Sequence, residues 1–148
     1  MKRDNILNKK LYENGIKKLD SVLDTMGYEA LRPGQDEAIH SILGGRDVIC
    51  FMPTSFGKSA IYQIPTMCQK WNTLVFSPLL SLIQDQVEKL QDINLSAGQV
   101  SSNQSDAENN LIMSDWELGD LNFLFAAPEK LTNERFIRTM TKRKPDMV

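Results

Sequence analysis

Cysteine and histidine are scarce in this chain of 148 residues. Cys50 and Cys68 stand far apart with no C-x-x-C pair, and His40 is the single histidine. Structural zinc sites need closely spaced cysteines and histidines, and small secreted folds depend on several disulfides. The composition therefore argues against a zinc cluster and a disulfide scaffold, and it fits the reducing interior of a cell.

Long apolar runs and an excess of one charge are also missing. No segment approaches the ~20 apolar residues that a membrane-spanning helix requires. The first residues, MKRDNILNKKLYENG, lack the apolar core of a secretory signal. The formal net charge of −2 gives the chain no general attraction for nucleic acid. We expect an intracellular protein without a membrane partner, which binds DNA only through a local surface.

What is present is the composition of one ordinary globular domain, with 41% apolar and 24% charged residues. Segments of helical and strand character alternate along it. Helices are predicted over 16–26, 31–43, 58–64, 79–93, 109–118 and 133–140. Gly27, Gly44-Gly45 and Gly119 follow three of them, Ser105 and Glu108 have capping-box spacing, and Pro65 should end or kink the helix before it.

The predicted strands are 47–52, 73–77, 95–100 and 121–127, and 145–148 looks like the start of another. Strands that alternate with helices imply an α/β fold whose parallel sheet is covered on both faces. Ligands of such sheets bind beyond the carboxyl ends of the strands. That edge would carry the loops at Pro53, Ser77 and Ala127.

The stretch FMPTSFGKSAIYQIP, residues 51–65, has the parts of a phosphate-binding loop. A predicted strand leads into it, and Gly57 allows backbone conformations that other residues avoid. A predicted helix follows, and the partial positive charge at its N-terminus attracts an anion. Lys58 and Ser59 then suit the outer phosphates and Mg²⁺. The alternative is a polar Gly-Lys-Ser turn on a surface, which the strand before and the helix after make less favourable.

Four stretches together resemble the RecQ-like DNA helicases of the DEAD/DEAH helicase group. They are MGYEALRPGQDEAI, MPTSFGKSAIYQIP, VFSPLLSLIQDQV and LFAAPEKL, and they occur in family order between Met26 and Leu131. The second departs from the family pattern at Ser55 and Phe56, where glycines are usual. Any one stretch could arise by chance, whereas the ordered set is specific.

The resemblance implies a three-layer RecA-like P-loop NTPase domain with a mainly parallel sheet, truncated before the strand that ends in Asp-Glu-Ala-His. Residues 1–27 would form an N-terminal helical segment, and 28–148 part of the ATP-binding domain. The implied function is the ATP-binding portion of a 3′-to-5′ DNA helicase that couples ATP hydrolysis to unwinding. Its cofactors would be ATP and Mg²⁺, and its partners DNA and the remainder of the helicase.

The resemblance also assigns roles to matching positions. Tyr28 and Arg32 would enclose the adenine ring, and Gln35 would hydrogen-bond its edge. Lys58 would serve catalysis by holding the β- and γ-phosphates, and Ser59 would bind Mg²⁺. The nucleotide-binding loop consists of Thr54, Ser55, Phe56, Gly57, Lys58 and Ser59, and the DNA contacts are Ser77, Pro78, Pro128 and Glu129.

Other readings of the same residues stay open. Without the Asp-Glu-Ala-His strand and a second motor domain, the chain is expected to be inactive alone. It could be a nucleotide- or DNA-binding module that needs a separately encoded remainder, or an inert gene remnant. Among single residues, Trp116 is expected to pack in the interior, His40 to be solvated or packed, and the basic cluster 142–144 to be a solvated face.

Overall fold

The computed structural model describes residues 2–53 and 55–148, with side chains from residue 8 onward. The chain divides into two compact units, Met1–Lys70 and Trp71–Val148. The domain boundary predicted after residue 27 concerns family domains, not compact units, and stays a prediction. Among the described residues, no helix is both long and apolar enough to cross a membrane.

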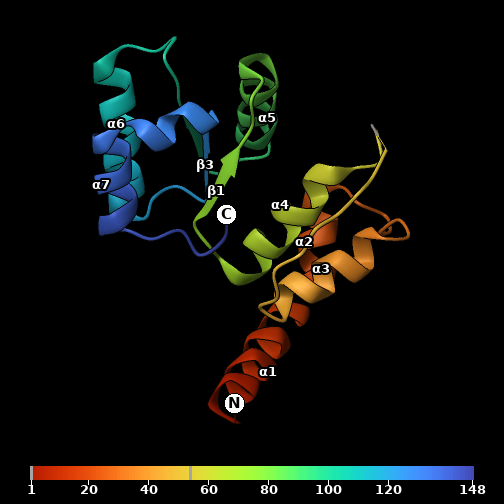
Figure 1. The fold of residues 1–148 in the computed structure, drawn as a ribbon. Helices are drawn as coiled ribbons and strands as arrows, with labels where there is room; N and C mark the ends of the chain where they lie inside the picture. Colours follow the sequence, from red (N-terminus) through yellow and green to blue (C-terminus); the bar gives the residue numbers. More distant parts are fainter. Residues whose placement is uncertain (1, 54) are drawn as a thin grey trace. The chain divides into compact units, whose positions relative to one another are not determined.

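The first unit consists of helices (Figure 1). They are α1 (Lys2–Ile16), α2 (Leu19–Met26), α3 (Gln35–Leu43) and α4 (Lys58–Gln69). As predicted, α2 ends at Gly27, which takes the left-handed conformation with φ 75°. The core of this unit is one apolar cluster drawn from α2, α3 and α4: Leu19, Ile39, Leu43, Ala60, Ile64 and Cys68.

Helix α4 continues past Pro65 to Gln69, so of the two predicted outcomes, an end or a kink, the end was wrong. A proline inside a helix removes one backbone hydrogen bond and costs about 3 kcal/mol. Here Ile64 and Cys68, on either side of it, are fully buried in the cluster. Apolar burial of about 1.5–3 kcal/mol per side chain offsets that cost, and local sequence does not reveal it.

The strand predicted over 47–52 is absent, and this segment is extended but unpaired among the described residues. Ile49 is 86% exposed and Phe51 is 96% exposed. A strand is stable only when a neighbour accepts and donates its backbone hydrogen bonds. The prediction rested on the apolar, β-branched character of the segment, but the described residues supply no such neighbour.

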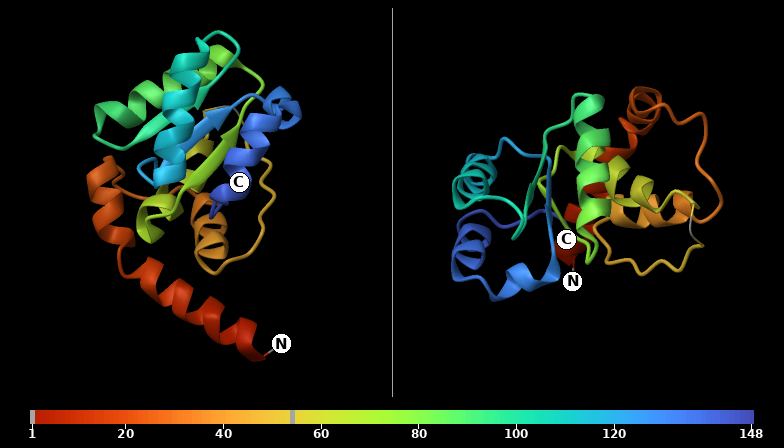
Figure 2. Two further views of the ribbon diagram at one scale, coloured as in Figure 1. Left: turned by 90° about the vertical axis from the view of Figure 1, so that its left-hand side faces the viewer. Right: turned by 90° about the horizontal axis from the view of Figure 1, so that it is seen from above.

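The second unit is built on a parallel sheet. Its strands are β1 (Thr73–Phe76), β2 (Ala97–Val100) and β3 (Phe123–Ala126), in the order β1-β3-β2. Between and after them come α5 (Leu80–Asp92), α6 (Asp106–Leu118), the 3₁₀ helix η1 (Pro128–Thr132) and α7 (Glu134–Lys142). Figures 1 and 2 show α5 on one side of the sheet and α6 with α7 on the other. The predicted three-layer α/β architecture is confirmed.

The residues predicted to begin and end helix α6 do so in the structure. Ser105 and Glu108 form the predicted capping box at the start of α6, and Gly119 ends that helix in the left-handed conformation. Met147 pairs in parallel with Thr73, and the Leu74 N–H donates to the Met147 carbonyl at 2.9 Å. Within the segment 145–148, Met147 thus lies beside β1 through one isolated bridge, and the rest of the segment forms no strand.

The core of the second unit lies between the sheet and the pair α6 and α7. Trp116 is fully buried there beside Leu124 and Phe136, and its Nε1 donates to the Arg143 carbonyl at 3.0 Å. The expectation that Trp116 is a packing residue is confirmed. Arg143 itself donates from Nη2 to the Asn72 side-chain oxygen at 2.7 Å, so it is a structural residue and not part of a solvated face.

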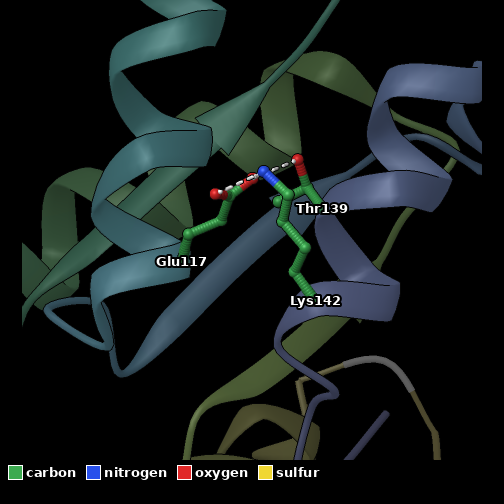
Figure 3. Close-up of polar contacts among 3 residues, drawn as sticks. All are labelled: Glu117, Thr139 and Lys142. Atoms are coloured by element: carbon green, nitrogen blue, oxygen red, sulfur yellow. Dashed lines mark hydrogen bonds and ion pairs between the residues drawn. The ribbon is translucent and has the colours of Figure 1, made fainter.

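A polar contact joins α6 to α7 at the surface (Figure 3). Lys142 Nζ lies 3.0 Å from Glu117 Oε2, and the Thr139 hydroxyl donates to Glu117 Oε1 at 3.1 Å. The hydrogen bond from Lys142 is the largest cause that lowers the pKa of Glu117 from its ordinary value. Lys142, like Arg143, thus holds helices together.

Candidate functional site

The phosphate-loop sequence forms a tight turn that leads directly into α4. The Phe56 N–H donates to the Pro53 carbonyl at 3.3 Å, and Gly57 then stands at the N-cap with φ 76°. Lys58, the first helical residue, is exposed and Ser59 is half-buried. The N-cap residue Gly57 has no side chain that could cap this helix, and a helix start of this kind suits an anion. The third N–H group, that of Ala60, already donates to the Gly57 carbonyl at 3.2 Å. Thr54, a predicted member of the loop, lies outside the described residues.

Two independent features require glycine at position 57. Its positive φ is disfavoured for residues with a side chain. In addition, a Cβ at this position would overlap the Gln35 Nε2 atom. Ser55, where the family usually has glycine, also has a positive φ of 69°. Such a backbone costs a non-glycine residue about 1–3 kcal/mol.

Gln35 connects the predicted adenine-reading segment to the loop. Its side chain is buried, and Nε2 donates to the Gly57 carbonyl at 2.9 Å and to the Phe56 carbonyl at 3.3 Å. Its Oε1 accepts from the Arg32 N–H at 2.8 Å. Both amide protons of Gln35 are therefore used within the protein, and a hydrogen bond from Gln35 to adenine requires one of them to change partner.

Arg32 makes a second connection to the same loop. Its Nη1 donates to the Ser55 carbonyl at 3.0 Å, and its guanidinium carbon lies 5.7 Å from the centre of the Phe56 ring. This distance is within the range of a cation–π contact. The aromatic partner of Arg32 in this structure is thus Phe56, a pairing that the sequence did not predict. Tyr28, the predicted second face of the adenine site, is half-buried against the apolar cluster of the first unit.

The residues predicted to contact DNA lie in the second unit, at the carboxyl edge of its sheet. Phe76 and Ala126 are paired at the ends of β1 and β3, and the Ser77 N–H donates to the Ala126 carbonyl at 3.1 Å. The two loops therefore start side by side, as expected. Pro78, Pro128 and Glu129 are exposed on them and Ser77 is half-buried.

The sequence profile of the DEAD/DEAH box helicase family matches residues 32–144. This chain belongs to that family. Its relatives include the ATP-dependent DNA helicase RecQ of Bacillus subtilis, 40% identical over 77% of this chain, and that of Haemophilus influenzae, 38% identical over 84%. An Arabidopsis thaliana ATP-dependent DNA helicase Q-like 5 is 41% identical over 75%. The predicted RecQ-like resemblance is confirmed.

The chain spans about a fifth of the length of the two bacterial relatives, 20% of each, and 12% of the plant one. The match begins at Arg32 and includes Gln35 and the whole phosphate loop. Both compact units therefore contain matched residues. The predicted sites fall within this match except for Tyr28.

The sequence did not predict a polar cavity that lies near the carboxyl end of β2. It has a volume of about 270 Å³, and its polar lining comes from Asp106, Asn109, Asn110, Lys130, Asn133 and Arg135. Asn109 holds the adjoining loop, because its side chain exchanges two hydrogen bonds with the Ser101 backbone. Lys130 directly follows Pro128-Glu129, the predicted DNA-contact turn. This neighbouring position is the sequence signal that points to the cavity.

Proposed function

We propose that this chain is the ATP-binding N-terminal portion of a RecQ-like 3′-to-5′ DNA helicase, in which ATP hydrolysis drives strand unwinding by the whole protein. The observation that carries the proposal is the start of α4 at a glycine N-cap. Gly57, Lys58 and Ser59 stand there, and Gln35 and Arg32 are hydrogen-bonded to the same loop. N–H groups at a helix start, an exposed ammonium and a hydroxyl are the donor set that a Mg-triphosphate requires.

Each of these residues would contact a different part of a bound nucleotide. The N–H groups at the start of α4 would bind phosphate oxygens, and Lys58 would neutralise the outer phosphates. The Ser59 hydroxyl would contribute one Mg²⁺ ligand, with phosphate oxygens and water as the others. Bound ATP supplies the phosphoryl group whose transfer releases energy. Arg32 would stack on the adenine, with Tyr28 as its second face and Gln35 at its edge.

Titration of the purified chain with Mg-ATP and Mg-GTP tests this assignment by calorimetry. We expect ATP to bind more tightly than GTP, Gln35→Ala to remove that preference, and Lys58→Ala to weaken ATP by ~10-fold or more because a charge-assisted bond is lost. Lys17→Ala is the matched control, since Lys17 is also exposed but lies outside the loop. Equal binding of ATP and GTP by the wild type would refute the adenine-reading role.

For DNA, we propose that a single strand contacts the carboxyl edge of the sheet through Ser77, Pro78, Pro128 and Glu129. Hydroxyl and backbone N–H groups there suit phosphate oxygens, so little net positive charge is needed. Lys130, beside this turn, adds a cation. In fluorescence anisotropy with a labelled oligothymidylate, Ser77→Ala and Lys130→Ala should each weaken binding, whereas Ser114→Ala, an exposed serine on α6, should not.

The alternative, a nucleotide-binding module without turnover, is favoured by Ser55. Its positive φ stores strain in the loop, and both amide protons of Gln35 are already bonded. The two candidates differ in phosphate release from ATP by the purified chain, with and without DNA. Release that Lys58→Ala abolishes would support the motor and exclude the module.

A further inference from the structure

A polar groove lies within the helical unit, away from the phosphate loop. Its volume is about 540 Å³, and residues of α1, α3 and the turn after α3 line it: Asn8, Lys9, Tyr12, His40, Ser41, Gly44 and Arg46. This volume falls in the usual range of small-molecule sites. Among the side chains that the structure describes, this lining contains no carboxylate, although the whole chain has more acidic than basic residues, 19 against 17.

One wall of the groove is an ordered aromatic pair. The Tyr12 hydroxyl lies 2.7 Å from His40 Nδ1, and His40 Nε2 lies 3.1 Å from Asp36 Oδ1. The two rings are 5.8 Å apart and tilted by 43°. Because both nitrogens of His40 have partners, the imidazole is held in place and in turn holds the Tyr12 ring. The sequence predicted a solvated or packed His40, and in the structure its two contacts position the Tyr12 ring.

Two cations complete the groove. Lys9 is 78% exposed at its side chain and only approaches Glu13, at 3.9 Å. The Arg46 side chain is exposed and has no ion-pair or hydrogen-bond partner within residues 8–53 and 55–148. Among the side chains that the structure describes, neither cation has a short ion pair that an anion would have to break. Arginine and lysine together with an amide and a hydroxyl form a donor set that suits phosphate.

We propose that this groove binds a nucleotide unit. Lys9 and Arg46 would contact its phosphate, and the Tyr12 ring would contact its base, because bases stack on aromatic side chains regardless of sequence. A free mononucleotide and one residue of a DNA single strand share this chemistry. None of the groove residues belongs to the phosphate loop, so the proposal does not depend on ATP binding at Lys58.

Amide NMR of the isotope-labelled chain locates the binding site directly. We expect deoxythymidine monophosphate to shift the amides of residues 8–12 and 40–46, and Lys58→Ala to leave these shifts intact. Stronger binding of a short oligothymidylate at the same amides would identify the strand as the source, and equal or weaker binding the free nucleotide. Inorganic phosphate that binds as tightly as the nucleotide would overturn the base contact and thus the proposal.

Charge reversal provides the second test. The double variant Lys9→Glu and Arg46→Glu should weaken nucleotide binding by ~10-fold or more, as loss of charge-assisted hydrogen bonds predicts. Lys10→Glu with Lys17→Glu makes the same change in net charge at exposed positions outside the lining and should have a small effect. Circular dichroism checks that both variants are folded. If both weaken binding equally, the attraction is general and the groove is not a site.

Discussion

Gly57 joins the phosphate loop to α4 and adopts a φ of 76°. Because it has no side chain, the amide of Gln35 can lie next to it. The Gln35 side chain occupies that space and donates hydrogen bonds to the Phe56 and Gly57 carbonyls, which attach it to the loop. A single glycine thus decides both the direction of the backbone and its attachment to the adenine-reading segment. The two effects can be separated by substitution.

We predict that Gly57→Ala destabilises the first unit and lowers nucleotide affinity more than conformational strain alone explains. Strain accounts for about 1–3 kcal/mol, and displacement of Gln35 adds to it. Gly27→Ala is the matched control, because Gly27 has a similar φ of 75° but open space around a built Cβ. Thermal unfolding and ATP titration measure the two effects. Equal losses of stability in both variants, with ATP affinity unchanged, would contradict the role of Gln35.

Among the helices, α6 and α7 are held by apolar packing inside and by the Glu117, Thr139 and Lys142 contact at the surface (Figure 3). The lowered pKa of Glu117 means that its charged form is favoured by folding. This stabilisation is complete at pH values above the ordinary pKa of 4.5. It is lost as the pH falls through the lower pKa of the folded state.

We therefore predict that Glu117→Gln is less stable than the wild type at neutral pH and that the difference disappears in acid. Urea unfolding between pH 3 and pH 7 measures it. Lys142→Gln should produce a similar loss at neutral pH, and adding it to Glu117→Gln should cost less than the sum of the two single changes, because they share one interaction. A loss that does not vary with pH would rule out the ion pair as its cause.

For the molecule as a whole, the extended segment 47–52 is the main exposed apolar feature of the first unit. Ile49 and Phe51, 86% and 96% exposed, stand two residues apart in this segment. An unpaired, apolar, extended segment favours pairing with another chain. We therefore expect this segment to promote self-association of the chain.

We predict that Ile49→Ser with Phe51→Ser reduces self-association and leaves the unfolding temperature nearly unchanged, because neither side chain is buried. Sedimentation velocity over a range of concentrations measures the change. Leu111→Ser with Leu118→Ser is the control, since these leucines of α6 are 63% and 70% exposed but belong to a helix whose backbone is already paired. If the control variant reduces self-association more, exposed apolar area is its cause and the unpaired backbone of 47–52 is not.

Much of the fold could be read from local chemistry. Gly27 and Gly119 end their helices, and Ser105 with Glu108 begins α6, because each of these effects acts between residues a few positions apart. The alternation of strands and helices likewise predicted the parallel sheet. The order of motifs pointed to the helicase family, since chemistry at a phosphate loop restricts both residue type and spacing.

What the sequence could not reveal depends on partners distant in the chain. Whether 47–52 becomes a strand depends on a neighbouring strand, and whether α4 passes Pro65 depends on the cluster that buries its flanks. Gln35 and Arg32 contact the loop about twenty residues later, and Tyr12 meets His40 across 28 residues. Such contacts form only when folding brings separate elements together, because no local hydrogen bond or spacing rule encodes them.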